Sequence, residues 1–201
     1  KKKKKKKKKT MIVLGVSVVI SAGIGLLIAF LIYAVNRDVY NAKFEQIAYA
    51  GYAYAYLSAY IFARMVHWLN MYPLFHKSAV MRGDSGNLRA NMLIYRQIGE
   101  GAHPGAIVLA EDGELGAYNR ANRSLTHFVE NSTGVALAVV LCSYPFALPT
   151  FISLCVFALG RIVHQIGYTN GYGSHAIGFL LSFLSLETLN GLLLLTAIKA
   201  T

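Results

Sequence analysis

Apolar residues in this chain gather into long uncharged stretches that alternate with polar segments. The longest uncharged stretch, Met11–Val35, covers 25 positions. A helix that crosses the hydrocarbon core of a bilayer needs about 20 such residues. The stretch is also too long for the core of a typical signal peptide, and no cleavage site is clear. We therefore predict that Met11–Val35 is a retained membrane-spanning helix.

Four further stretches are predicted to cross the membrane. They are Ile47–Ala63 with its extension to Asn70, Arg120–Tyr144, Ala147–Tyr168 and Ala176–Ile198. The first of these four is the least apolar, and it follows a short polar link, Asn36–Gln46. Pro145 and Pro149 mark a tight turn between the next two stretches. The pattern thus predicts five spans.

Tyrosines recur along the second predicted span. Tyr49, Tyr52, Tyr56 and Tyr60 follow one another at steps of three, four and four residues, which is the spacing of one helical face. Tyrosines of this kind usually serve packing or anchoring at the membrane interface, and less often they contact a ligand. The sequence leaves both interpretations open.

The chain changes character between the second and third predicted spans. Met71–Asn119 is rich in glycine and carries charges of both signs. We predict that it is an extramembrane loop, in which Leu88–Ile98 can form a short helix on the membrane surface. Loops of this length are usually functional or partly disordered.

The composition agrees with a membrane protein. Hydrophobic residues make up 55% of the 201 positions and charged residues only 14%, whereas about 25% of a soluble domain is charged. The length suits one domain. The predicted fold class is therefore an all-α membrane protein.

The net charge of +11 comes mainly from an N-terminal run, Lys1–Lys9. The rest of the chain has 11 basic and 9 acidic residues, without a basic stripe interleaved with aromatic residues, so nucleic-acid binding is not expected. Residues 1–10 are either a polybasic tail that anionic lipids attract or a tag or unassigned sequence. If the run is native, it holds the N-terminus in the cytoplasm, and five spans place Met71–Asn119 and Thr169–His175 on the same side.

Ionisable side chains inside predicted spans are the main candidates for function, because charge is costly in a bilayer. The third predicted span carries a stripe of such residues on one helical face. The stripe consists of Arg120, Arg123, His127 and Glu130, with Asn131 extending it. The spacing therefore points to a polar face in an otherwise apolar helix.

Polar side chains also recur at helical spacing in the last two predicted spans. These are Arg161, His164 or Gln165, and Tyr168 in the fourth, and Glu187 and Asn190 in the fifth. Arg161 could neutralise Glu130 across two helices and fix their register. Alternatively, the polar residues form a cavity at the cytoplasmic end for a small zwitterionic ligand, since an arginine binds a carboxylate through two parallel hydrogen bonds. For Glu187 the sequence favours a role in helix packing.

Several kinds of site are disfavoured by the sequence. It contains no HExxH pair, no glycine-rich phosphate loop and no serine nucleophile elbow. Cys142 and Cys155 lie in apolar runs, where thiols act as small hydrophobic residues, and no metal site is expected. His127 and His164 are candidates for proton transfer, although a histidine inside a bundle is more often a hydrogen-bonded core residue.

Two segments resemble signatures of the MAPEG family, the membrane-associated proteins of eicosanoid and glutathione metabolism. Arg120–Asn131 (RANRSLTHFVEN) resembles the second-helix pattern R-A-x-R-x-x-x-N-x-x-E, and Gly160–Tyr168 (GRIVHQIGY) resembles the third-helix pattern R-x-x-[YH]-x-x-G-Y. The resemblance implies a four-helix bundle over Ile47–Ile198, with Met11–Val35 as an extra helix. It also implies a homotrimer that binds glutathione between subunits near the cytoplasmic face.

The resemblance assigns roles to particular residues. Those implied to bind glutathione are Arg120, Arg123, His127, Glu130, Asn131 and Arg161, and those implied to assist its thiolate are His164, Tyr168 and His175. Two positions depart from the family pattern. His127 replaces the usual asparagine, and His175 falls near the place of an arginine that stabilises the thiolate in active members. A neutral histidine stabilises an anion less than a fixed cation does, so these departures put catalysis in doubt more than binding.

The sequence thus leads to two main functional hypotheses. The first is a glutathione transferase or peroxidase that acts on lipophilic electrophiles or lipid hydroperoxides, in an endoplasmic reticulum or mitochondrial membrane if the source is eukaryotic. The second is a non-catalytic member of the family that binds lipid or serves as an accessory subunit of a larger membrane complex, which the extra helix and the long loop favour. A transporter or channel is less supported, because the sequence has no inverted repeat and no pair of broken helices.

Overall fold

The structure is a computed structural model that describes residues 2–81, 93–97, 107–171 and 173–201. Within these ranges the chain forms six helices and one small hairpin. The helices are α1 (Lys2–Val35), α2 (Arg37–Tyr49), α3 (Ala53–Met81), α4 (Gly113–Ser143), α5 (Ala147–Asn170) and α6 (Ala176–Ala200). The strands β1 (Tyr95–Gln97) and β2 (Ile107–Leu109) pair antiparallel, with Arg96 opposite Val108. The predicted helical fold class is confirmed.

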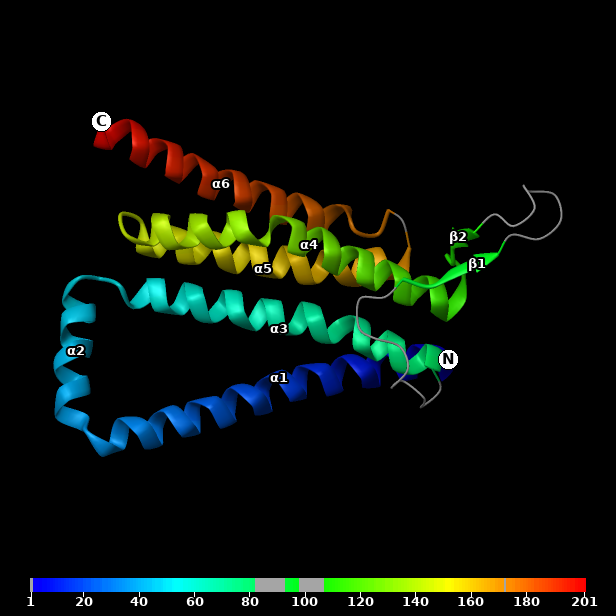
Figure 1. The fold of residues 1–201 in the computed structure, drawn as a ribbon, viewed down its shortest axis with the longest axis horizontal. Helices are drawn as coiled ribbons and strands as arrows, with labels where there is room; N and C mark the ends of the chain where they lie inside the picture. Colours follow the sequence, from blue (N-terminus) through cyan, green and yellow to red (C-terminus); the bar gives the residue numbers. More distant parts are fainter. Residues whose placement is uncertain (1, 82–92, 98–106, 172) are drawn as a thin grey trace.

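Helices α3 to α6 run side by side as an antiparallel bundle (Figure 1). Helix α1 lies outside α3, and α2 runs across from the end of α1 to the start of α3. The N-terminus, the hairpin and the α5–α6 turn gather at one end of the bundle, which we call the hairpin end. The α2 helix, the α4–α5 turn and the C-terminus gather at the other, which we call the elbow end. The start of α1 and the described parts of the 71–119 and 169–175 regions therefore lie at the same end of the bundle.

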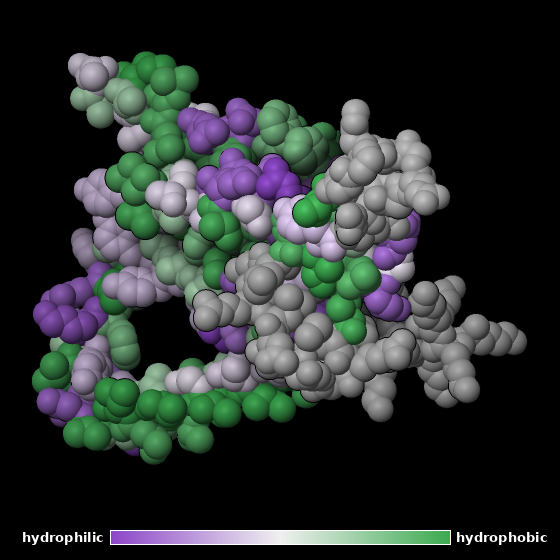
Figure 2. All heavy atoms as spheres, turned by 45° about the vertical axis from the view of Figure 1, so that its right-hand side comes forward, coloured by the Kyte–Doolittle hydropathy of each residue, from purple (hydrophilic) through white to green (hydrophobic). Residues whose placement is uncertain are grey.

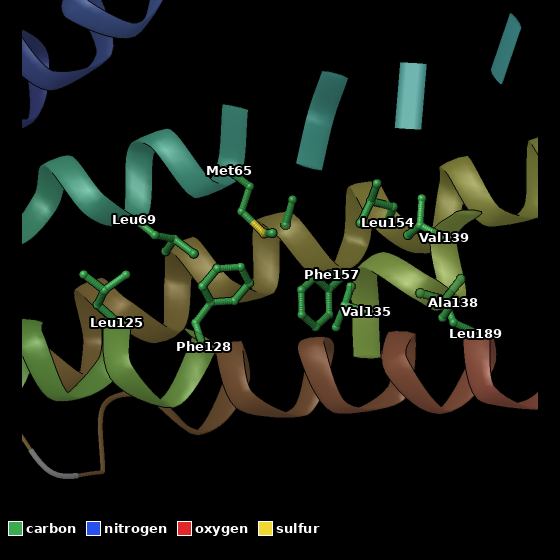
Figure 3. Close-up of a cluster of buried hydrophobic side chains, with 11 residues drawn as sticks. Met65, Leu69, Leu125, Phe128, Val135, Ala138, Val139, Leu154, Phe157 and Leu189 are labelled. Carbon is green, nitrogen blue, oxygen red and sulfur yellow. The ribbon is translucent and has the colours of Figure 1, made fainter. Parts of the chain in front are cut away.

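The main apolar cluster in the core of the bundle receives side chains from all four helices (Figure 3). Its largest members are Met65 and Leu69 from α3, Phe128 from α4 and Phe157 from α5. Leu189 supplies the contact from α6 and is fully buried. Burying such side chains contributes about 2 kcal/mol each, so this cluster fixes how the four helices pack.

Four of the described helices are long and apolar enough to cross a membrane. They are Gly15–Val35 within α1, and α4, α5 and α6 in full. Their outward faces carry large apolar side chains such as Leu137, Leu159 and Leu184, each more than half exposed. Exposed apolar area of this extent suits a lipid environment. The chain thus has four candidate membrane-spanning helices, which agree with four of the five predicted spans.

The second predicted span, Ile47–Ala63, is divided between two helices. Ile47 belongs to α2, a turn follows in which Gly51 has φ +71°, and α3 begins at Ala53. Helix α3 is not among the four candidates, because it includes many tyrosine, histidine and other polar residues. The predicted tyrosine face is also interrupted, since Tyr49 ends α2 while Tyr56 and Tyr60 lie in α3.

Two predicted connecting segments are largely helical. The predicted link Asn36–Gln46 lies mostly in α2. The predicted loop Met71–Asn119 is too long, because α3 continues past Pro73 to Met81 and α4 already begins at Gly113. The predicted helix Leu88–Ile98 is wrong where it is described, since Tyr95–Gln97 is a β-strand, and its other residues outside 93–97 lie beyond the described ranges.

The hairpin is attached to the bundle by one side chain of α4. The Asn119 amide nitrogen donates to the carbonyl oxygens of Ile94 and Ala110, and its oxygen accepts from the Ile94 backbone N–H, all at 2.8 Å. Asn119 is almost fully buried. These bonds hold both strands against the first turns of α4.

Helix α1 touches the bundle only along part of its length. Val18 packs beside Tyr72 of α3, and Arg64 Nη1 donates to Ser21 Oγ at 3.4 Å. Towards α2 the two helices diverge and leave an opening that Figure 2 shows in the space-filling view. The corner between α1 and α2 is held by Tyr33, whose hydroxyl donates to Asn41 Oδ1 at 2.9 Å. Helix α1 therefore lies beside the bundle and contacts it over part of its length.

Candidate functional site

Arg123 and Glu130 form an ion pair on the outer face of α4. The Arg123 Nη1 to Glu130 Oε1 distance is 3.0 Å, and the two side chains are 49% and 51% exposed. The predicted shared face of these residues is thus confirmed. The alternative pairing of Glu130 with Arg161 is wrong, because the Glu130 side chain is half exposed whereas Arg161 is buried inside the bundle.

Arg161 of α5 is a buried cation that contacts a backbone carbonyl, an imidazole and a phenyl ring. Its Nη2 donates to the Ser124 carbonyl oxygen at 3.0 Å, its Nη1 lies 3.4 Å from His127 Nδ1, and its guanidinium stands 5.7 Å from the centre of the Phe128 ring. Its Nε is buried without a hydrogen-bond partner. Among the described residues no carboxylate pairs with it. An unpaired buried cation favours an anion nearby.

His164 lies at the centre of the polar cluster. Its Nδ1 is 3.0 Å from Ser124 Oγ, a hydrogen bond between two buried side chains of α5 and α4. Which partner donates depends on the histidine tautomer. Because Ser124 Oγ bonds His164 while its carbonyl accepts from Arg161, this one residue links two of the predicted site residues.

Aromatic and imidazole rings surround His164. Its ring stacks on Tyr168 with centroids 5.7 Å apart and planes 8° apart, and it meets His175 edge-on at 5.3 Å. Tyr168 meets His175 at 5.2 Å, and His127 approaches His164 from α4 at 6.0 Å. The structure thus brings together the rings of His127, His164, Tyr168 and His175.

Two glycines allow this close arrangement at the hairpin end. A Cβ atom on Gly178 of α6 would overlap the backbone of His164. A Cβ atom on Gly167 would likewise overlap the Ser174 backbone, next to His175. Glycine is the only residue that permits such contact between backbones. These positions therefore let the start of α6 come close enough to bring His175 beside His164 and Tyr168.

Two other predicted site residues lie outside this cluster. Arg120 donates from Nε to the Thr169 carbonyl at 3.2 Å and from Nη1 to the Glu111 carbonyl at 2.7 Å. These bonds connect the first part of α4 with the end of α5 and with the segment that precedes α4. Asn131 donates to the His127 carbonyl of its own helix at 2.8 Å and is exposed. Arg120 and Asn131 therefore both bond backbone carbonyls.

Glu187 does not pack between the described helices of this chain. It is exposed on α6, and its carboxylate accepts from Asn190 Nδ2 at 3.4 Å. Its position faces outward because α6 turns Leu189 towards the core instead.

Two residues of the hairpin end were not identified from the sequence as central. Ser124 carries no pattern that distinguishes it from other serines. Gln165, named only as an alternative to His164, donates to the carbonyls of Leu69 at 3.0 Å and Ala121 at 3.4 Å. It therefore joins α3, α4 and α5 at a buried point. No sequence spacing reveals either contact.

The cluster combines groups of different chemistry. The half-exposed ion pair of Arg123 and Glu130 lies on α4, and the guanidinium of Arg161 is buried between the helices. Three imidazoles and the phenol of Tyr168 lie nearby. In the described ranges, no group of three or more histidine, cysteine or acidic side chains is arranged to hold a metal ion. The arrangement is suited to binding charged groups and to donating hydrogen bonds to an anion.

Comparison with protein-family models, curated proteins and solved structures found no match to this chain. The resemblance to the MAPEG family therefore rests on the two sequence motifs and the residues within them.

Proposed function

We propose that this chain is an integral membrane protein that binds glutathione at the hairpin end and uses its thiol on lipophilic substrates. The substrates are electrophiles or lipid hydroperoxides that arrive from the bilayer. The observation that carries the proposal is the buried Arg161, a cation without a carboxylate partner in the described structure, beside three histidines and Tyr168.

The charges of glutathione complement those of the cluster. Glutathione carries two carboxylates, an ammonium and a thiol. Arg123 can bind a carboxylate of glutathione, and Glu130 can bind its ammonium. Arg123 would thereby exchange the Glu130 carboxylate for a carboxylate of the ligand, and Glu130 would exchange the Arg123 guanidinium for the ammonium of the ligand. Arg161 supplies the positive charge that favours a thiolate. Binding thus leaves each of these three charges with an opposite charge nearby.

The proposed reaction starts at the thiol of glutathione. The thiol gives its proton to water or to an imidazole of the cluster, and Tyr168 or His175 donates a hydrogen bond to the resulting thiolate. With an electrophile, a sulfur–carbon bond forms and the leaving group departs with its electron pair. With a hydroperoxide, the thiolate attacks the terminal oxygen, the O–O bond breaks, and the lipid alkoxide takes up a proton. A second glutathione then reduces the sulfenic acid and yields the disulfide and water.

A turnover assay on the purified protein tests this proposal. Glutathione and 1-chloro-2,4-dinitrobenzene, or a lipid hydroperoxide, are the substrates. Arg123→Ala is expected to raise the KM for glutathione about 30-fold, because a charge-assisted hydrogen bond contributes about 2 kcal/mol. Arg37→Ala, which removes an arginine of α2 at the elbow end, serves as the matched control and is expected to leave KM unchanged. The absence of turnover and of glutathione binding in the wild type would overturn the proposal.

The proposal includes a homotrimer. Arg123 and Glu130 are half exposed on a helix that is a candidate membrane span. Charged groups facing lipid are costly, so contact with a second copy of the chain would reduce that cost and enclose the ligand. Native mass measurement in detergent is expected to give three copies, and Arg123→Leu is expected to shift the population towards smaller species. A monomer at all concentrations would contradict this part of the proposal.

A second candidate function is that of a non-catalytic, lipid-binding or accessory subunit of a larger membrane complex. The observation that favours it is α1, whose spanning segment has no buried residue within this chain. A membrane helix with so little contact to its own bundle is available to another protein. Glutathione binding without turnover, together with a stable heteromer in native mass measurements, would favour this function over the first.

A further inference from the structure

A groove lies between α3 and α4 at the elbow end, remote from the cluster described above. Its volume is about 370 Å³, which is within the range of small-molecule sites. It is lined on one side by Tyr52, Ala55, Tyr56 and Ala59 and on the other by Val139, Val140, Ser143 and Tyr144. Ala55 and Ala59, one helical turn apart, have small side chains that leave space beside α3. The ring centroids of Tyr52 and Tyr144 are 5.9 Å apart, at the end of the groove nearest the α4–α5 turn.

One residue that lines the groove carries a buried polar atom that lacks a partner. Ser143 is 5% exposed, and its Oγ makes no hydrogen bond. Other buried serines of the bundle are satisfied, for example Ser182, which donates to the Gly178 carbonyl at 2.8 Å. An unpaired buried hydroxyl costs about 1 to 3 kcal/mol. Ser143 lines the groove, so a rotation of its side chain about χ1 would offer this hydroxyl to a molecule that fills the groove.

The lining limits the kind of molecule that fits. None of the eight residues is acidic or basic, so a carboxylate or phosphate would find no counter-charge. Tyr52 and Ala59 are seven residues apart, which spans about 10 Å along a helix at 1.5 Å per residue. The small alanines and the flat tyrosine rings form a smooth wall, which favours a rigid, flat molecule over a flexible chain.

The position along α4 fixes the orientation of such a molecule. Ser143 is the last residue of α4, a candidate membrane span, and Tyr144 follows at the turn. Tyrosines are common at the membrane–water boundary. A ligand bound to Ser143 would thus have its polar group at that boundary and its apolar body deeper, beside Ala59 and Val139.

We propose that this groove binds an uncharged sterol-type lipid, whose single hydroxyl forms a hydrogen bond with Ser143 Oγ. The rings of the sterol pack against Ala55 and Ala59 on one side and Val139 and Val140 on the other. The site is independent of glutathione binding, since it lies at the opposite end of the bundle and shares no residue with the polar cluster.

A neighbouring groove provides an internal control. It has a volume of about 420 Å³ and lies between the ends of α4 and α6, with Leu193, Thr196 and Ala197 on its α6 side. The Thr196 hydroxyl already donates to the Leu192 carbonyl at 2.8 Å. Because this groove has a similar size and a satisfied hydroxyl, a sterol that needs an unpaired hydroxyl should prefer the first groove.

Photolabelling tests the proposal. The full chain is placed in phosphatidylcholine vesicles with a photoreactive cholesterol, irradiated, digested and analysed by mass spectrometry. Adducts are expected on residues 52–59 and 139–144, and unlabelled cholesterol should compete for them. Adducts mainly on residues 193–197, or labelling that does not saturate, would overturn the assignment. Stronger competition by palmitate or by a diacyl phospholipid would overturn the sterol class.

Matched variants separate the hydrogen bond from changes in folding. Ser143→Ala is expected to reduce saturable labelling about 5-fold to 10-fold, whereas Ser132→Ala on the same helix, whose hydroxyl bonds the Val129 carbonyl, should not change it. Ala59→Phe fills the groove and should abolish labelling. Leu57→Phe, at an exposed α3 position outside the groove, should leave it intact. Equal labelling of Ser143→Ala and wild type would contradict the proposed contact.

Discussion

Two serines of α4 are buried at opposite ends of the bundle, and their surroundings differ. Ser124 at the hairpin end is 2% exposed, bonds His164 through its hydroxyl and accepts from Arg161 through its carbonyl. Ser143 at the elbow end is 5% exposed, and its hydroxyl has no partner. The same residue type, equally buried on the same helix, thus belongs to a closed hydrogen-bond network at one end and to an open groove at the other.

The difference shows how one bundle can present two kinds of site. At the hairpin end, glycines bring α5 and α6 into backbone contact, so polar side chains are held close and satisfy one another. At the elbow end, the space between α3 and α4 is left open beside alanines and tyrosines. A charged ligand suits the first end and an uncharged lipid suits the second.

The largest effect is expected from Gly178→Ala, which tests whether close backbone contact holds the hairpin end together. The added methyl group would overlap the His164 backbone, and we expect a loss of about 3 kcal/mol in the free energy of unfolding. Gly191→Ala on the same helix is the control, because nothing lies within 4 Å of its Cβ position. It should leave stability unchanged or raise it by up to about 1 kcal/mol. Equal losses from the two changes in detergent unfolding would contradict this account of α6.

A smaller, local effect is expected from Asn119→Ala, which removes the three side-chain bonds to the hairpin. We expect hydrogen exchange at the Ile94 and Ala110 amides to become about 30-fold faster, which corresponds to about 2 kcal/mol of local opening. Asn70→Ala, an exposed residue that bonds only its own helix, should not alter these amides. Unchanged protection after Asn119→Ala would mean that other contacts hold the strands.

The most direct comparison of the two ends uses the serines themselves, and its effects are the smallest. Ser124→Ala should lower the free energy of unfolding by about 1 kcal/mol, because His164 loses a buried hydrogen bond. Ser143→Ala should be neutral or slightly stabilising in detergent without sterol, since its hydroxyl has no partner to lose. Nitrogen chemical shifts of His164 should change only in the first variant. The reverse order of stabilities would break the comparison.

The sequence predicts the apolar helices well and the connections poorly. An uncharged stretch such as Met11–Val35 is sufficient to predict a membrane-spanning helix, because length and hydropathy alone define a candidate span. Helix α2 was missed because its 13 residues alternate polar and apolar groups without a long apolar run. Helix α3 was predicted to end too early, because Pro73 and the glycines that follow Met81 resemble a loop, whereas Pro73 lies inside the helix.

Helical spacing predicts which polar residues share a face but not their contacts, and His175 follows only from the family resemblance. Spacing correctly placed Arg123 and Glu130 on one face and His164 beside Tyr168. It could not predict that Glu130 turns to Arg123 rather than to Arg161, since that choice depends on how deeply each side chain is buried between helices. Ser124 and the opening beside Ser143 were also beyond prediction, because both arise from the packing of α4 against its neighbours.

Equilibrium binding of radiolabelled glutathione to the detergent-purified chain is the measurement that tests the central proposal most directly. We expect saturable binding by the wild type and by Arg37→Ala, and about 30-fold weaker binding by Arg123→Ala and Arg161→Leu. Circular dichroism and the free energy of unfolding of each variant show whether a loss of binding reflects the site or the fold. Binding that is absent in the wild type, or that is equal in folded wild type and folded Arg123→Ala and Arg161→Leu variants, would contradict the proposal that the hairpin end holds glutathione.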